Sequence, residues 1–171
     1  MIRTILHYPN PRLREAGERI ETVTPEIQRL VDDMAETMYA APGVGLAATQ
    51  LGERVQLFVI DIAAEDEPSD LRVFINPEIL ETHDSLVWNE GCLSFPGVSE
   101  EIERAARVRV RAQDRDGKIF ELEAEGLLAV AIQHENDHLR GMLMIDHMGP
   151  LKKRIIHRKM QKRADEHPSA E

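Results

Sequence analysis

Residues 127–140 read LLAVAIQHENDHLR, and this stretch decides the fold. Its first six residues are apolar on every side of a helix, which predicts an interior helix that Gly141 ends. The same helix carries the pattern HExxH. Because residues four apart lie on one helical face, His134 and His138 can offer two imidazole nitrogens to one metal ion, with Glu135 beside the bound water. The alternative is a pair of histidines on a solvated face, which the preceding apolar residues disfavour.

A catalytic metal site of this kind normally has a third protein ligand and an open position for water. Three candidates lie downstream of the helix: Asp146, His147 and His157. A fourth lies upstream: Cys92, the single cysteine of the chain, in the segment EGCLS at 90–94. A lone cysteine is more often a buried small hydrophobe than a nucleophile or a ligand, but a thiolate beside two imidazoles suits Fe(II), Zn(II), Ni(II) or Co(II). Composition and spacing leave all four candidates open.

The flanking sequence predicts helices and strands in no regular alternation, which indicates an α+β domain. Apolar spacing, turn residues and caps place the expected elements as follows: a helix from Thr24-Pro25-Glu26 to Pro42-Gly43, strands at 55–62 and 71–75 with Pro77 closing the second, a hairpin of 107–113 and 120–124 around Asp116-Gly117, and a terminal helix.

The length of 171 residues argues for one domain, spanning 1–171, because domains hold roughly 100 to 200 residues. The composition, 42% hydrophobic and 30% charged, is that of an ordinary globular protein. The longest apolar run, Leu127–Ile132, is far too short to cross a bilayer. The opening MIRTILHYPN lacks the apolar segment of a secretory signal, so we expect a cytoplasmic protein with no membrane partner.

Charge is unevenly distributed along the chain. The formal net charge is −10, yet residues 152–163 read KKRIIHRKMQKR and carry seven lysines and arginines without an acid. Ile156 and Met160 would let one face of a helix at about 150–165 pack on the domain while the bases face outward. Such an arm indicates either attraction to a polyanion, such as RNA or an anionic membrane surface, or a solvated helix that balances an acidic body.

Residues 43–50 read GVGLAATQ. They follow a helix instead of a strand and lack the third glycine of a dinucleotide-binding loop, so we do not expect them to hold a phosphate. Their small side chains would let an extended backbone pass close to a ligand, and Gln50 brings an amide donor. A plain loop is the alternative interpretation.

Taken together, GVGLAATQ at 43–50, EGCLS at 90–94 and QHENDHLRG at 133–141 resemble the three signature motifs of bacterial peptide deformylases, in the same order and at matching separations. HYPNPRLR at 7–14 is similar to the family's usual opening. The resemblance implies mixed or antiparallel sheets around the HExxH helix. It selects Cys92 as the third ligand, and it implies one labile Fe(II) ion that zinc, nickel or cobalt can replace.

The reaction that this resemblance implies is hydrolysis of the formyl group from the N-formylmethionine of new polypeptides, with release of formate. An ion held by Cys92 and the two histidines would make a water molecule more acidic. Glu135 would accept its proton and pass it to the leaving nitrogen. By the same resemblance, the Gln50 side chain and the Leu93 backbone N–H would stabilise the charge on the carbonyl oxygen.

By analogy with the family, the peptide would lie extended between Gly45 and Gly91 and bond backbone to backbone, a mode that reads chain direction rather than side chains. Its methionine side chain would enter an apolar pocket formed by Val44, Trp88, Leu127, Val130 and His134. Ordinary core packing is the alternative for each apolar member. An ion pair of Glu90 with Arg104 is expected behind the site.

Two positions depart from the family pattern. Thr49 stands where proline is usual, which would leave the loop of Gln50 less rigid. Ser99 stands where some relatives carry an arginine that meets the far end of the peptide, which argues against a carboxylate-binding role there.

The basic arm Lys152–Arg163 resembles the C-terminal helix by which some family members dock at the ribosomal exit tunnel, where RNA phosphates would attract it. Two rival functions stay open. A small metalloprotease that cuts internal peptide bonds would need a downstream third ligand. A catalytically silent ribosome-binding module would keep the motifs only as structure.

Overall fold

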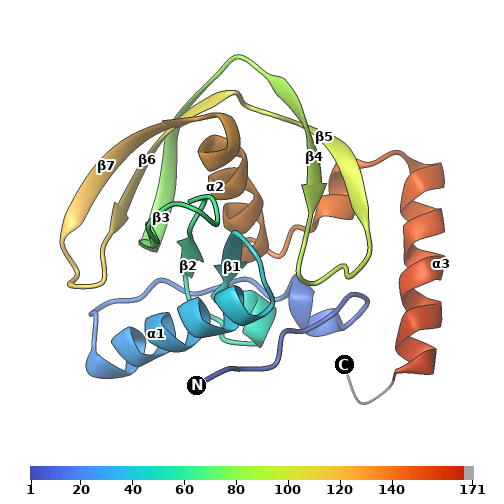
Figure 1. The fold of residues 1–171 in the computed structure, drawn as a ribbon, viewed down its shortest axis with the longest axis horizontal. Helices are drawn as coiled ribbons and strands as arrows, with labels where there is room; N and C mark the ends of the chain where they lie inside the picture. The colour runs from blue at the N-terminus through green and yellow to red at the C-terminus, as the bar shows by residue number, and fades with distance from the viewer. Residues whose placement is uncertain (168–171) are drawn as a thin grey trace.

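The HExxH helix, α2, spans Gly126–Leu139 and lies between two sheets in the computed structural model, which describes residues 1–167 (Figure 1). The predicted interior position is confirmed, because Ala129–Ile132 are buried. Gly141 follows the helix with a φ of 74°, in the left-handed region. A Cβ there would lie 2.4 Å from the Arg14 carbonyl oxygen, so the close approach of the backbones also requires glycine.

The larger sheet is antiparallel and has the strand order β1-β2-β3-β6-β7. Its strands are β1 (Gly45–Ala47), β2 (Leu57–Ile60), β3 (Arg72–His83), β6 (Arg107–Gln113) and β7 (Ile119–Glu125). The predicted hairpin is β6–β7, in which Val108, Val110 and Ala112 are buried and the intervening residues lie toward solvent. Alternation of this kind indicates one wet face and one face on the core.

The prediction that Pro77 closes a strand is wrong. β3 continues through Pro77 to His83, and its register against β6 shifts between Ile75 and Glu78. Asn76, at the shift, has a φ of 52°, and its side chain bonds both backbone groups of Ile20. A bulge lets the strand accommodate a residue that has no N–H to donate.

At residues 43–50 the alternative of a plain loop is wrong, since the segment contains the extended strand β1 and the start of the 3-10 helix η2 (Ala48–Leu51). A second sheet, which the sequence did not predict, pairs β4 (Leu86–Gly91) with β5 (Ser99–Arg104) in antiparallel fashion. This hairpin stands apart from the larger sheet, on the side of the C-terminal helix (Figure 1).

Three further helical elements are α1 (Pro25–Ala40) and the 3-10 helices η1 (Pro11–Arg14) and η3 (Met144–His147). Thr24 caps α1 as predicted, because its side chain accepts a hydrogen bond from the Ile27 N–H. The apolar face of α1 packs on β1 and β2.

The C-terminal helix α3 (Pro150–Glu166) buries Ile156 and Met160 against Leu6, Leu13 and Phe95, which confirms the predicted packing face. The α+β class, the antiparallel sheets and the C-terminal helix are therefore as expected. The end of the expected domain, residues 168–171, lies outside the described residues. Within residues 1–167, no helix combines the length and apolarity that a membrane crossing requires.

Candidate metal centre

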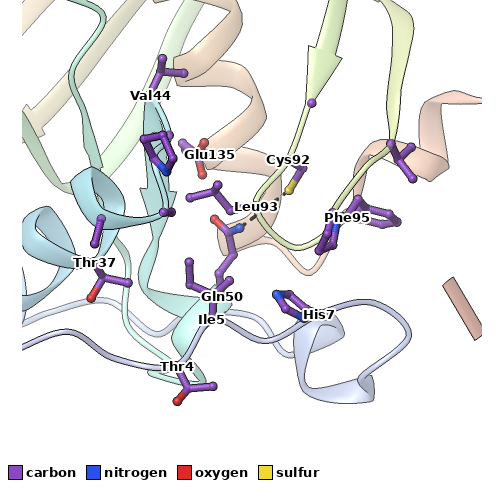
Figure 2. Close-up of a pocket in the computed structure, with 18 of the residues that line it drawn as sticks. Thr4, Ile5, His7, Thr37, Val44, Gln50, Cys92, Leu93, Phe95 and Glu135 are labelled. Carbon is purple, nitrogen blue, oxygen red and sulfur yellow. Dashed lines mark hydrogen bonds between the residues drawn. The ribbon is translucent and has the colours of Figure 1, made fainter. Parts of the chain in front are cut away.

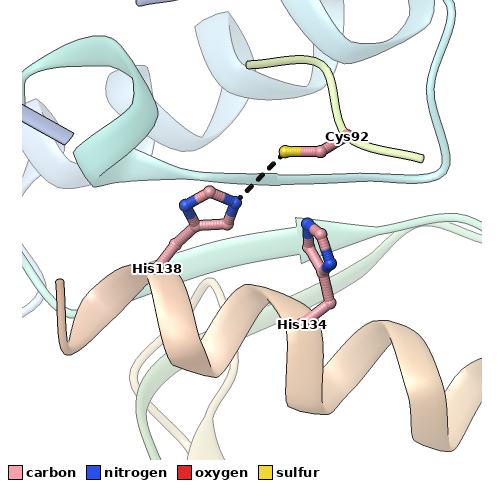
Figure 3. A group of neighbouring side chains, drawn as sticks. All are labelled: Cys92, His134 and His138. Atoms are coloured by element: carbon pink, nitrogen blue, oxygen red, sulfur yellow. Dashed lines mark hydrogen bonds between the residues drawn. The ribbon is translucent and has the colours of Figure 1, made fainter. Parts of the chain in front are cut away.

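Two distant segments bring Cys92, His134 and His138 together. Both histidines project from α2 toward Cys92, which follows directly after β4 (Figure 3). One ligand atom from each residue lies within 4.8 Å of the other two, and Cys92 Sγ is 3.4 Å from His138 Nε2. These separations are close to the span that one ion bridges with bonds of about 2.3 Å to sulfur and about 2.1 Å to nitrogen. The cluster is compatible with one metal ion.

Glu90 and Arg104 fix the orientation of His134 from the side of the ring opposite the cluster. Its Nδ1 lies 2.8 Å from Glu90 Oε1, and because a carboxylate can only accept, Nδ1 carries the proton and Nε2 is left for the cluster. Arg104 holds the same carboxylate in a two-bonded fork, Nε to Oε2 at 2.7 Å and Nη2 to Oε1 at 2.9 Å. The expected pairing of Glu90 with Arg104 is thus present, and both side chains are buried.

Burial and neighbouring charges set the protonation of Glu90 and His138. Burial alone would raise the pKa of Glu90, but Arg104 and His134 outweigh it, and the pKa lies below its ordinary value. Burial also lowers the pKa of His138, with the neighbouring His134 adding to the effect. His138 is therefore neutral, the form in which imidazole binds metals.

The three downstream candidates for a third ligand are engaged elsewhere. Asp146 accepts from Arg14 and from the Leu143 N–H. His147 Nε2 lies 2.8 Å from Asp137 Oδ2, and His157 Nδ1 lies 2.6 Å from the Tyr8 hydroxyl. Of the four candidates, only Cys92 joins the two histidines.

Glu135 is a buried carboxylate beside the cluster. Its Oε1 has no hydrogen-bond partner among the described residues, and its Oε2 lies where a Cβ on Gly45 would approach to 2.6 Å. Burial raises the pKa of Glu135 to about 7. A buried carboxylate with an unused oxygen and a pKa near neutrality is suited to proton transfer.

A groove of about 850 Å³ runs past these residues, between the chain at Val44 and Gly45 and the chain at Cys92 and Leu93 (Figure 2). Gln50 also lines it.

The Gln50 amide is held in a fixed orientation. Its Oε1 accepts from the Ala47 N–H at 2.9 Å, while its Nε2 donates to Ser94 Oγ at 3.0 Å and lies 3.7 Å from Cys92 Sγ. The donor end of the amide therefore faces the cysteine side of the groove. Ser94 was not singled out from the sequence, although it lies only two residues after Cys92.

A smaller cavity of about 170 Å³ adjoins the groove, with which it shares His134 and Glu135. The residues predicted for an apolar pocket all line it: Val44, Trp88, Leu127, Val130 and His134, together with Gly91. Trp88 is 37% exposed, so it lies at the margin of the cavity, whereas Val130 is buried.

The two departures from the family pattern have different surroundings. Thr49 is buried, and its hydroxyl donates to the His138 carbonyl at 3.0 Å, which ties the turn of Gln50 to α2. Ser99 begins β5 with an exposed side chain and is not among the residues that line the groove.

An HExxH helix that places two histidines beside a cysteine, with a buried glutamate on the adjoining groove, defines a hydrolase-like site. A family model described as polypeptide deformylase matches residues 2–154. The peptide deformylase of Azotobacter vinelandii is 52% identical over 167 residues, which cover 97% of this chain and 98% of its own. The crystal structure of a peptide deformylase from Legionella pneumophila superposes with a TM-score of 0.91 at 44% identity, covering 98% of both chains. That of Ehrlichia chaffeensis gives 0.92 at 33% identity, covering 96% of this chain and 98% of its own. The chain belongs to the polypeptide deformylase family, which is a family of enzymes.

The raised pKa of Glu135 predicts a pH-dependent stability of the metal-free protein. Between the ordinary value of 4.5 and about 7, the folded state holds a proton that the unfolded state has lost. The free energy of unfolding should therefore fall as pH rises through this window, by at most about 3 kcal/mol from Glu135. Glu135→Gln should remove this contribution, which urea unfolding at pH 5 and pH 8 would measure. The same pH dependence in the variant and the parent would contradict it.

Proposed function

We propose that this chain hydrolyses the formyl group from the N-formylmethionine of new polypeptides in the cytoplasm, with release of formate. The observation that carries the proposal is the buried Glu135, with an unpartnered oxygen, beside a Cys-His-His cluster on one groove. The relatives named peptide deformylase support the choice of reaction over cleavage of internal peptide bonds. The downstream third ligand that a metalloprotease would need has no support, because those candidates bond elsewhere.

We propose Cys92, His134 and His138 as the ligands of one divalent ion, Fe(II) in the cell, for which Zn(II), Ni(II) or Co(II) can substitute. A soft thiolate with two imidazoles suits these ions. The thiolate has a cost, since it weakens the ion as a Lewis acid and exposes both Fe(II) and Cys92 to oxidation.

The ion would supply Lewis acidity and make water more acidic. Glu135 takes the proton from water with its unpartnered oxygen and delivers it to the leaving nitrogen. Gln50 donates from Nε2 to the carbonyl oxygen as negative charge develops there, together with the Leu93 backbone N–H. The Ala47 N–H fixes the Gln50 amide in advance, so little reorganisation is needed.

The groove walls suit an extended peptide. β1 is an edge strand of the larger sheet, and within residues 1–167 β4 pairs with β5 alone, so in this part of the chain each strand leaves one backbone edge unpaired. We propose that the peptide bonds to the backbone at Gly45 on one side and at Gly91 on the other. Its methionine side chain would occupy the cavity of about 170 Å³ beside His134.

Formate release is the direct test of the reaction. Anaerobically purified protein with its metal should release formate from a formyl-Met peptide and leave the acetyl-Met analogue intact. An unformylated peptide, analysed for internal cleavage, tests the metalloprotease. Internal cleavage without formate release would replace the proposal by that rival, and loss of all activity with a full complement of metal would favour a silent module.

Glu135→Gln should bind one metal ion per chain and lose nearly all turnover, because Glu135 moves protons and is not a ligand. Metal content and formate release, measured on the same preparation, check this. Metal loss in the variant equal to its activity loss would show that Glu135 has been assigned the wrong role.

Gly45→Ala should lower turnover by about 100-fold, because the added Cβ would displace a Glu135 oxygen that lies 2.6 Å away. Gly149→Ala is the matched control, since nothing lies within 4 Å of a Cβ at that position. The measurement is kcat for formate release in both variants. Equal kcat values in the Gly45 variant and the control would contradict the close fit of Gly45 against Glu135.

We further propose that α3 carries the protein to ribosomal RNA near the exit tunnel through Lys152–Arg163. Four of its bases are bound within the chain: Lys152 pairs with Glu100, Lys153 with Asp146, Lys159 donates to the Gly97 carbonyl, and Arg163 bonds His7. Arg154, Arg158 and Lys162 are exposed on the helix and face solvent. These three side chains are the best placed to reach phosphates.

Replacing Arg154, Arg158 and Lys162 by glutamine should weaken salt-sensitive sedimentation with ribosomes and leave kcat/KM on a free peptide within twofold. Deletion of the helix would also disturb the fold, because Ile156 and Met160 belong to the core. Glutamine at three exposed bases elsewhere, Arg19, Arg29 and Lys118, controls for net charge. Unchanged sedimentation of the α3 variant, or equal loss in the control, would remove the claim.

A further inference from the structure

His147 ends a row of polar contacts that begins at the metal cluster. His134 Nδ1 donates to Glu90 Oε1 at 2.8 Å, and Arg104 binds both oxygens of Glu90. Arg104 Nη1 then donates to Asp137 Oδ2 at 2.7 Å. His147 Nε2 lies 2.8 Å from the same oxygen, so it carries the proton and donates to it.

The row runs from the interior to the surface. The side chains of Glu90 and Arg104 are 3% and 4% exposed, that of Asp137 is 14% exposed and that of His147 is 27% exposed. His147 lines a separate concavity of about 760 Å³, which Asp137 and Arg104 also line. Residues from four elements, β4, β5, α2 and η3, are thus linked by contacts that lead to the His134 ring.

We propose that His147 is a positioning residue of the metal centre, which holds Asp137 against Arg104 and thereby fixes Glu90 and the His134 ring. The inference rests on the metal centre of the proposed function. Groups that hold a metal-binding histidine in orientation typically change metal affinity by 10- to 100-fold when removed. His147 acts on Glu90 only through two intervening residues, Arg104 and Asp137, so a smaller effect is expected.

Two donors share one oxygen of Asp137, and this is why His147 matters to the geometry. Arg104 Nη1 and His147 Nε2 are 3.3 Å apart, and they lie 2.7 Å and 2.8 Å from the carboxylate oxygen that they share. Without His147, Asp137 would keep only Arg104 and could turn toward solvent in the concavity. Arg104 would then lose a fixed partner on one side while still holding Glu90 on the other.

The carboxylate behind His134 gives a second reason. A hydrogen bond from Nδ1 to a carboxylate also makes the opposite ring nitrogen a better ligand.

The fold at η3 does not depend on His147. Leu143, Met144 and Ile145 are buried in a core cluster, and Asp146 binds Arg14. A variant at the partly exposed His147 should therefore fold, so its effect on the metal can be measured.

The test compares His147→Phe, which keeps a ring and removes the donor, with His147→Gln, which keeps an N–H donor. His83→Phe is the matched control, because His83 also faces a carboxylate, Glu81 at 3.4 Å, on the exposed end of β3. Each full-length protein is loaded with cobalt(II), and loss of the cobalt–thiolate absorption is followed in excess chelator, without substrate. Urea unfolding of the metal-free proteins is measured in parallel.

We expect His147→Phe to release cobalt about 3- to 10-fold faster than the parent, and His147→Gln and His83→Phe to stay within twofold. A rate within twofold for His147→Phe would overturn the proposal. Equal acceleration in both His147 variants, or an acceleration matched by a lower urea midpoint of the metal-free protein, would reduce His147 to a structural role and overturn it too. Because no substrate is present, failure here is distinct from failure to release formate.

Discussion

The structure depends on burying a helix that carries three groups able to hold charge. Burial of α2 removes His134, Glu135 and His138 from water, and unpartnered polar groups in such a place cost free energy. The Glu90–Arg104 pair satisfies His134 and joins β4 and β5 to the helix. Glu135 Oε1 and His138 Nδ1 stay without a partner among the described residues, and Glu135 lies on the groove, where its unpartnered oxygen is available for proton transfer.

The walls around this helix are shaped by small residues and open strand edges. Gly45 leaves room for the Glu135 carboxylate, and Thr49 ties the turn of Gln50 to the carbonyl of His138. The hydroxyl of Thr49 thus makes a contact that a proline ring could not. Because β1 and β4 each lack a partner on one side, the same two segments that place Gln50 and Cys92 also offer backbone groups to a ligand.

Sequence patterns predicted the parts of this molecule that depend on local periodicity. Helices α1 and α2, the β6–β7 hairpin and the buried face of α3 follow from apolar spacing, caps and turns within each segment. The end of β3 was predicted wrongly because a strand can continue through Pro77 only with a bulge against β6, and no local sequence pattern shows that bulge. The β4–β5 hairpin was missed because most residues of β5 are charged and the short β4 carries Glu90; the burial of Glu90 and Arg104 is explained only by the fold.

The residues of the candidate site also fall into those that a local motif predicted and those that it did not. HExxH indicated His134, Glu135 and His138 directly. Residue spacing did not distinguish Cys92 from Asp146, His147 and His157 as the third ligand, and from the sequence only the family resemblance favoured Cys92. The contacts of Asp137 and Ser94 join residues 10 to 44 positions apart, so they could not be read from any single motif.

The central claim is that one sulfur and two imidazoles bind the same ion, and X-ray absorption at the metal edge of the zinc-loaded protein measures this directly. The account predicts one sulfur at about 2.3 Å and two nitrogens at about 2.0 Å, with the sulfur lost in Cys92→Ser. A spectrum of nitrogen and oxygen neighbours alone, the same in the parent and in Cys92→Ser, would contradict it.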